Sequence, residues 1–111
     1  MFKLVFFAPI SHVEEVKVAV FQAGAGRYEK YDSCSWQTEG TGQFRPLDTS
    51  DPFIGSPGTI ERVPECRVEI LCRDEVVRPA IKALLNAHPY EEVAYEVYEV
   101  WQQSNLPARI P

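Results

Sequence analysis

The first part of the chain has the pattern of a strand followed by a helix. Phe2 to Ala8 is apolar at nearly every position, which is typical of a strand buried on both faces. Ser11 and Glu14 have the spacing of a capping box, and apolar residues then recur at helical spacing until Gly24. Because a glycine often ends a helix, we expect this helix to run from Ser11 to Ala23.

The rest of the chain predicts three more strands and a second helix. Alternating polar and apolar residues predict strands from Tyr31 to Thr38 and from Val63 to Cys72, and a last strand is expected from Val93 to Trp101. An apolar stripe at helical spacing predicts a helix from Asp74 to Ala87. Pro79 lies inside that range, and because proline lacks a backbone N–H, the helix must begin close to it or bend there.

The order strand, helix, strand, strand, helix, strand indicates a ferredoxin-like α+β fold, in which both helices cover one face of an antiparallel sheet. This topology places three connections at one end of the molecule: Pro9 to His12, Gly40 to Gly58, and His88 to Val93. His12 and His88, the two histidines of the chain, are therefore expected at that end.

Large apolar residues are expected on both faces of the last strand. Tyr95, Val97 and Trp101 alternate with Tyr98 and Val100. Because two helices cannot cover both faces of the sheet, the remaining apolar face predicts packing against another subunit and hence a homo-oligomer.

The segment from Gly40 to Gly58 is predicted to be a long loop, because it is rich in Gly, Pro, Thr, Ser and Asp. Loops of this length are usually functional or disordered. Gly40 and Gly42 would let a ligand approach the backbone closely. Alternatively, the loop is an arm that packs on a neighbouring subunit through Phe44 and Phe53.

A second candidate segment contains His88, Tyr90, Glu91 and Glu92 and follows the predicted second helix. The proline after His88 disfavours helical geometry at the histidine, so the helix should end there. In one interpretation the imidazole closes the helix by bonding to a backbone carbonyl. In the other, these residues and His12 bind a ligand or a divalent metal, whose usual ligands are imidazoles and carboxylates.

Composition limits the classes of function. The chain has 111 residues and a net charge of -5, and its charges are interspersed, so nucleic acid is not an expected partner. Three widely spaced cysteines argue against a disulfide framework, and no signal peptide or membrane span is recognisable. We expect a cytoplasmic protein with a single domain over residues 1–102, including the loop 40–58, and a flexible tail over residues 103–111.

Five short motifs occur in an order that resembles a known family. The motifs are Gly24-Ala25-Gly26, Tyr31-Asp32-Ser33-Cys34-Ser35-Trp36, Gly40-x-Gly42-x-Phe44-x-Pro46, Pro52-Phe53-Ile54-Gly55 and Ala87-His88-Pro89-Tyr90-Glu91-Glu92. From Phe2 to about Trp101 the chain resembles the inserted domain of the YqfO branch of the family named after the yeast NGG-one-interacting factor three. We expect a free-standing version of that insert.

The resemblance implies a fold similar to the PII signalling proteins and the CutA trimers, so it favours a trimer. It also implies that the 40–58 loop takes the place of the mobile recognition loop of PII proteins. Larger members of the family carry two metal ions on flanking domains and are sometimes described as GTP cyclohydrolase homologues. None of those metal ligands matches a position in this sequence, so the hydrolase activity is not transferred.

Together these observations favour a small regulatory or ligand-binding domain, and they leave open whether it is an enzyme. Its ligand would be a small molecule, a metal ion or a partner protein. The candidate ligand-binding residues are His12, Gly40, Gly42, Phe44, His88 and Tyr90, and the candidate metal ligands are His12, His88, Glu91 and Glu92. The alternatives are a metal-dependent hydrolase or its accessory subunit, and a purely structural oligomerisation module.

Overall fold

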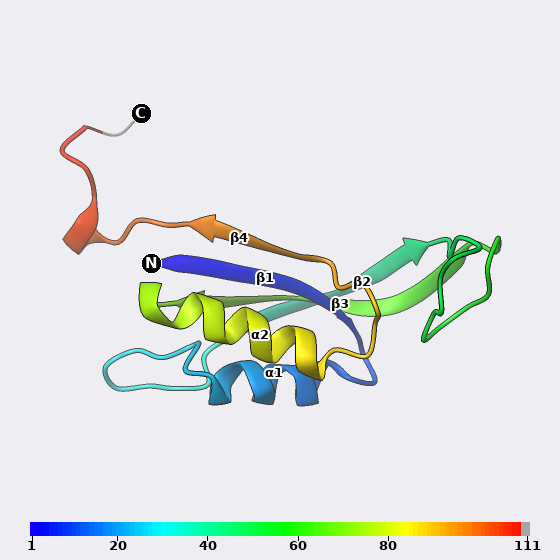
Figure 1. Cartoon of the computed structure of the whole chain (residues 1–111). Coiled ribbons are helices and arrows are strands. Elements are labelled where there is room, and N and C mark those ends of the chain that lie inside the picture. Colours follow the sequence, from blue (N-terminus) through cyan, green and yellow to red (C-terminus); the bar gives the residue numbers. More distant parts are fainter. Residues whose placement is uncertain (110–111) are drawn as a thin grey trace.

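The computed structural model describes residues 1–109 and has a four-stranded antiparallel sheet with two helices on one face (Figure 1). In chain order the elements are β1 (Phe2–Pro9), α1 (Val13–Gln22), β2 (Trp36–Phe44), β3 (Glu61–Cys72), the 3₁₀ turn η1 (Asp74–Val76), α2 (Val77–Ala87), β4 (Tyr95–Glu99) and the 3₁₀ turn η2 (Gln103–Asn105). The strand order is β2-β3-β1-β4, and all neighbours are antiparallel. The predicted ferredoxin-like α+β fold is therefore confirmed.

The hydrophobic core lies between the helices and one face of β1 and β3. Leu4 pairs with Ile70, and Phe6 with Val68, so these side chains share the face that the helices cover. The helices contribute Val13, Val16, Val20, Ala80 and Leu84, all of which are buried. Two of the three cysteines, Cys66 and Cys72, are buried in the same core, and all three are free.

The helices leave β4 uncovered. All five residues of this strand are exposed, on both faces. The register places Tyr95 and Val97 on the helix side of the sheet and Tyr98 on the opposite side, which we call the open face. The apolar alternation expected in this strand is present, although the strand is shorter than the predicted Val93 to Trp101.

The predicted position of β2 was wrong. The strand starts at Trp36 and not at Tyr31, because the preceding residues form a loop: the Cys34 N–H donates to the Gly26 carbonyl, and the Tyr28 N–H donates to that of Tyr31. It then continues through Gly40 to Phe44, which the sequence assigns to the loop because the segment 40–58 is rich in Gly, Pro, Thr, Ser and Asp. The loop proper covers residues 45–60.

The predicted start of the first helix also differs. The helix begins at Val13 with His12 as the N-cap, and no side chain caps it. The Ser11 hydroxyl instead lies 2.7 Å from Nδ1 of His12. The capping box is therefore not formed, while the predicted stop at Gly24 agrees with its φ of +108°.

Pro79 occupies the third position of α2, within the first helical turn. The backbone N–H groups of that turn have no intrahelical partner, so the missing donor of proline costs nothing there. The segment from Asp74 to Val76, which was predicted as helix, forms the 3₁₀ turn η1.

The predicted C-terminal tail contains η2, and its last residues, 110–111, lie outside the described part of the chain. Within residues 1–109, no helix is long and apolar enough to cross a membrane.

Candidate functional site

Three connections meet at the end of the molecule where β1 ends, as the topology predicted. We call this region the loop end; it comprises residues 10–12, 45–60 and 88–94 (right side of Figure 1). Direct contacts join the three segments: the Asp51 N–H donates to the Glu91 carboxylate, and the ring of His12 meets that of Phe53 edge-on at 5.2 Å. The structure thus places His12 and Glu91 against the same loop, residues 45–60.

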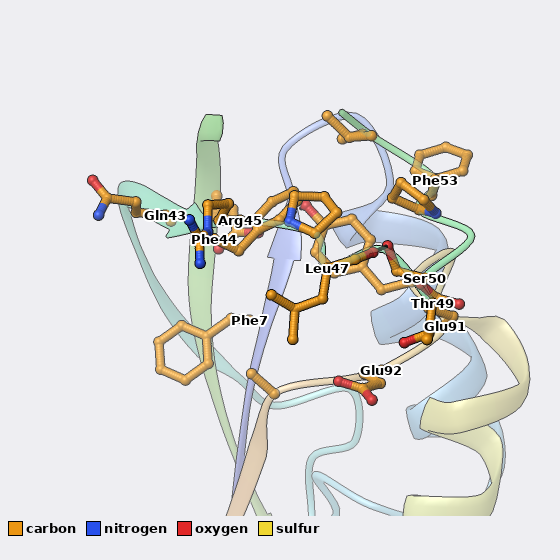
Figure 2. Close-up of a pocket in the computed structure, with 17 residues that line it drawn as sticks. Phe7, Gln43, Phe44, Arg45, Leu47, Thr49, Ser50, Phe53, Glu91 and Glu92 are labelled. Carbon is orange, nitrogen blue, oxygen red and sulfur yellow. Dashed lines mark hydrogen bonds between the residues drawn. The ribbon is translucent and has the colours of Figure 1, made fainter. Parts of the chain in front are cut away.

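A pocket of about 500 Å³ opens at the loop end. Phe7 of β1, Phe44 at the end of β2 and Glu65 of β3 line it from the sheet, while Leu47 and Tyr90 come from the two loops. Figure 2 shows Leu47 extending from its loop into the space near Phe7, and Glu92 lies on the side of the leucine that is away from the Phe7 ring. Phe7 and Glu65 lie on the open face, so the pocket is on the side of the sheet away from the helices.

Tyr90 is at the centre of an aromatic cluster. Its ring centroid lies 4.9 Å from that of His88, 5.9 Å from that of Phe44 and 6.4 Å from that of Phe53. Such separations are those of favourable aromatic pairs. The cluster connects the end of β2, the 45–60 loop and the segment after α2, so the pocket wall depends on the position of this one tyrosine.

The hydroxyl of Tyr90 donates a hydrogen bond of 2.9 Å to Oε2 of Glu65. Burial and the neighbouring carboxylate both raise the pKa of Tyr90, so the phenol keeps its proton. A Cβ added at Gly42 would lie 2.0 Å from Oε1 of Glu65, whereas one added at Gly40 would have no neighbour within 4 Å. The group that lies close to the backbone at Gly42 is therefore the Glu65 carboxylate, and the approach of a ligand to these glycines stays a prediction.

His88 is held by both of its ring nitrogens. Nδ1 accepts the backbone N–H of Tyr90 at 3.1 Å, so the proton is on Nε2, which donates to the carbonyl oxygen of Phe7 at 2.7 Å. Burial of the ring lowers the pKa of His88, although the bond to Phe7 and the charge of Glu65 oppose that shift. The geometry agrees with the structural interpretation: α2 ends here, in extended backbone, and the imidazole bonds a carbonyl.

The four candidate metal ligands are not arranged as a metal site. Within residues 1–109, no group of three or more His, Cys, Asp or Glu side chains could hold an ion. His88 has both nitrogens engaged, and the two Glu91 oxygens lie 3.0 and 3.2 Å from the backbone nitrogen of Asp51. Glu92 lines the pocket, and His12 contacts Ser11 and Phe53. The geometry therefore does not support the predicted metal site.

Of the candidate ligand-binding residues, Gly42, Phe44 and Tyr90 line the pocket, while Gly40, His12 and His88 do not. Outside the loop 40–58 and the connection His88 to Val93, sequence reasoning missed three lining residues, Phe7, Glu65 and Ala94. Phe7 was assigned to a doubly buried strand, and Glu65 was one of many scattered acids. One signal was available for Glu65, because it lies on the opposite strand face from Cys66, Val68 and Ile70 and close to the long loop.

No family model matches the chain. Several proteins named GTP cyclohydrolase 1 type 2 homolog are similar to it in sequence, and two of them illustrate the similarity. The one from Mycobacterium leprae is 46% identical over 96 residues, which are 86% of this chain and 25% of that protein. The one from Bacillus subtilis is 43% identical over 100 residues, which are 90% of this chain and 27% of that protein. The chain therefore spans about a quarter of the length of these relatives.

Solved structures show the same relationship. A Bacillus cereus protein related to NIF3 superposes with a TM-score of 0.74 at 44% identity, over 87% of this chain and 24% of that one. CutA1 from Pyrococcus horikoshii superposes with a TM-score of 0.63 at 17% identity, over 90% of this chain and 83% of that one. The PII-like protein CutA from Nostoc superposes with a TM-score of 0.66 at 15% identity, over 96% of this chain and 86% of that one. At these lower identities the likeness concerns the fold alone.

The sequence similarity covers most of this chain, and the two CutA structures are matched over most of their own length. The chain is thus a homologue of a segment of the NIF3-related proteins named GTP cyclohydrolase 1 type 2 homolog, and it has the PII/CutA-like fold.

Proposed function

We propose that this chain is a small regulatory binding domain, and that its ligand occupies the pocket at the loop end. The observation that carries this proposal is the pocket itself, whose volume of about 500 Å³ falls within the range of small-molecule sites. Its walls combine apolar and aromatic side chains with a few polar groups, which is the usual composition of such sites.

The contacts of the 45–60 loop support a regulatory role. The Glu91 carboxylate holds the loop at Asp51, and the rings of His12 and Tyr90 contact Phe53. Phe53 is nevertheless half exposed, so its ring is only partly packed. A ligand that touches Leu47 and Tyr90 together would stabilise the loop in this position, and a change in loop order is an established way to alter how a partner docks.

The activity named for the relatives is not part of this proposal, because this chain corresponds to only about a quarter of those proteins. None of the observations in the pocket favours hydrolysis over binding. A cytoplasmic location remains a prediction.

We also propose that the chain forms a homo-oligomer, and the family resemblance favours a trimer. Trp36 is 61% exposed although it sits in a strand, and its partner in the register is Glu69, which places it on the open face. Tyr98 of β4 is exposed on the same face. Exposed apolar surface of this kind is typical of an interface.

Native mass spectrometry of the untagged protein in ammonium acetate tests both proposals. We expect a homo-oligomer that carries an adduct of constant mass, and we expect the adduct to disappear in Ala94→Trp, which fills the pocket where Ala94 lines it. A monomer would contradict the assembly. An adduct that persists in Ala94→Trp would place the ligand elsewhere, and the absence of any adduct would contradict a tightly bound ligand.

A further inference from the structure

Glu65 is a partly buried carboxylate that lacks a basic partner. Within residues 1–109, the carboxylates that form ion pairs are Asp74, Glu14 and Glu69, and Glu65 is not among them. Its side chain lines the pocket and is not fully exposed to water. Glu65 therefore places a carboxylate at the pocket wall without a cationic side chain beside it.

Two neighbours hold the Glu65 carboxylate in place. Tyr90 donates its hydroxyl to Oε2 at 2.9 Å. Gly42 leaves room for Oε1, because any Cβ at that position would lie 2.0 Å from this oxygen. One hydroxyl uses one of about four acceptor positions on a carboxylate, so the others remain available to a ligand.

The basic residues of this region either pair with another carboxylate or are exposed to solvent. The Nε of Arg67 is 3.5 Å from Glu69, and its guanidinium carbon is 5.7 Å from the ring centroid of Phe7. Arg45 lines the pocket but is exposed, and the same lining contains the carboxylates of Glu65, Glu91 and Glu92. Three carboxylates against one guanidinium give the lining a net negative charge.

The remaining walls of the pocket suit an organic cation. Phe44 and Tyr90 line it with aromatic rings, and the faces of such rings attract ammonium and guanidinium groups; Phe7, over whose ring the Arg67 guanidinium lies, adds apolar area. A metal ion does not fit, because the described residues provide no group of three ligating side chains. We propose that the ligand of this pocket carries an ammonium or guanidinium group on an apolar body, and that Glu65 is its charge contact. This inference rests on the proposed function of the pocket as a binding site.

Three probes of nearly equal shape test the charge preference: 2-phenylethylamine, the neutral 2-phenylethanol and the anionic phenylacetate. Their binding is measured by amide chemical shifts in ¹H–¹⁵N spectra of the whole chain, with the shifts mapped to the pocket. We expect the amine to bind about tenfold more tightly than the alcohol, since one charge-assisted hydrogen bond is gained. Phenylacetate is expected to bind more weakly than either.

Glu65→Gln keeps an acceptor for the Tyr90 hydroxyl but removes the charge, so the preference for the amine should vanish. Gly42→Ala should reduce it by displacing the carboxylate, while Gly40→Ala should not, because nothing lies within 4 Å of that position. Glu15→Gln, on the exposed surface of α1, is the charge control and should bind like the wild type. Circular dichroism confirms that each variant is folded before it is compared.

The outcomes separate this inference from the proposed function. If all three probes shift pocket amides equally, or if phenylacetate binds best, the cation proposal is overturned while the pocket remains a binding site. If no probe shifts pocket amides, both are overturned. A capped Leu-Lys-Leu tripeptide identifies the source of the cation: tighter binding than the amine supports a lysine of a protein partner, and weaker binding supports a free small molecule.

Discussion

His88 links the end of β1 to the segment after α2. Its ring donates to the carbonyl of Phe7 and accepts the N–H of Tyr90, and the side chain is only 6% exposed. We predict that His88→Ala lowers the free energy of unfolding by about 2 kcal/mol, because both backbone groups lose a buried partner. Urea unfolding measures this difference.

The matched variant is His88→Gln, which retains one amide donor that can reach the Phe7 carbonyl. It should lose less stability than His88→Ala. Equal stability of His88→Ala and the wild type would contradict the structural role of this side chain.

The same histidine predicts a pH dependence. Because burial lowers the pKa of His88 in the folded state, the unfolded chain binds a proton at higher pH than the native chain does. Protonation of the unfolded chain therefore lowers the free energy of unfolding. This loss of stability is absent well above about pH 6.5, the ordinary pKa of histidine, and it grows as the pH falls from there toward the lowered pKa. Urea unfolding at pH 7.5 and 5.5 should show a larger loss of stability for the wild type than for His88→Gln. An equal loss would contradict the assignment.

Sequence reasoning was successful for residues whose role is decided by their chain neighbours. The proline after His88 predicts the end of α2, and the structure ends the helix there. Glu65 was missed because its role depends on residues distant in sequence: Tyr90, in the segment after α2, bonds it, and Gly42 of the paired strand β2 clears space for it. Pairing registers of this kind are not encoded in any single stretch of the chain.

At the scale of elements, the strand β2 shows the same limit. Its glycines and polar residues lack a strand pattern after Thr38, so the sequence predicts loop where the structure has strand as far as Phe44. Pairing with β3, which is a clear strand, stabilises the extended conformation of this weak segment. The helices were predicted within a few residues because their apolar residues recur at helical spacing, and β1 was predicted because it is a continuous apolar run.

The 45–60 loop is attached to the rest of the loop end through Glu91. We predict that Glu91→Ala increases hydrogen exchange of the amides around Asp51 about fivefold, because the acceptor of the Asp51 N–H is lost. The neighbouring variant Glu92→Ala is the control, since this residue also lines the pocket but is not the acceptor. Exchange is followed by mass spectrometry of peptides from this loop. Equal protection in both variants would show that the Glu91 contact does not hold the loop.

At the scale of the whole molecule, the open face decides how copies assemble. Trp36 and Tyr98 are exposed on that face, so burying them against another copy would remove apolar area from water. We predict that Trp36→Glu dissociates the proposed oligomer, as measured by light scattering coupled to gel filtration. Tyr31→Glu is the control, because Tyr31 is 72% exposed and lies outside the sheet. If Trp36→Glu keeps the wild-type mass, the interface lies elsewhere.

The central claim is that the pocket at the loop end is where this domain binds its ligand. A fragment library screened by ¹H–¹⁵N spectra against the wild type and Ala94→Trp tests it most directly. We predict that the hits shift the amides of Phe44, Leu47 and Tyr90 in the wild type, and that these shifts are lost in the filled variant. Hits that map to another surface, or that bind Ala94→Trp equally well, would contradict the claim.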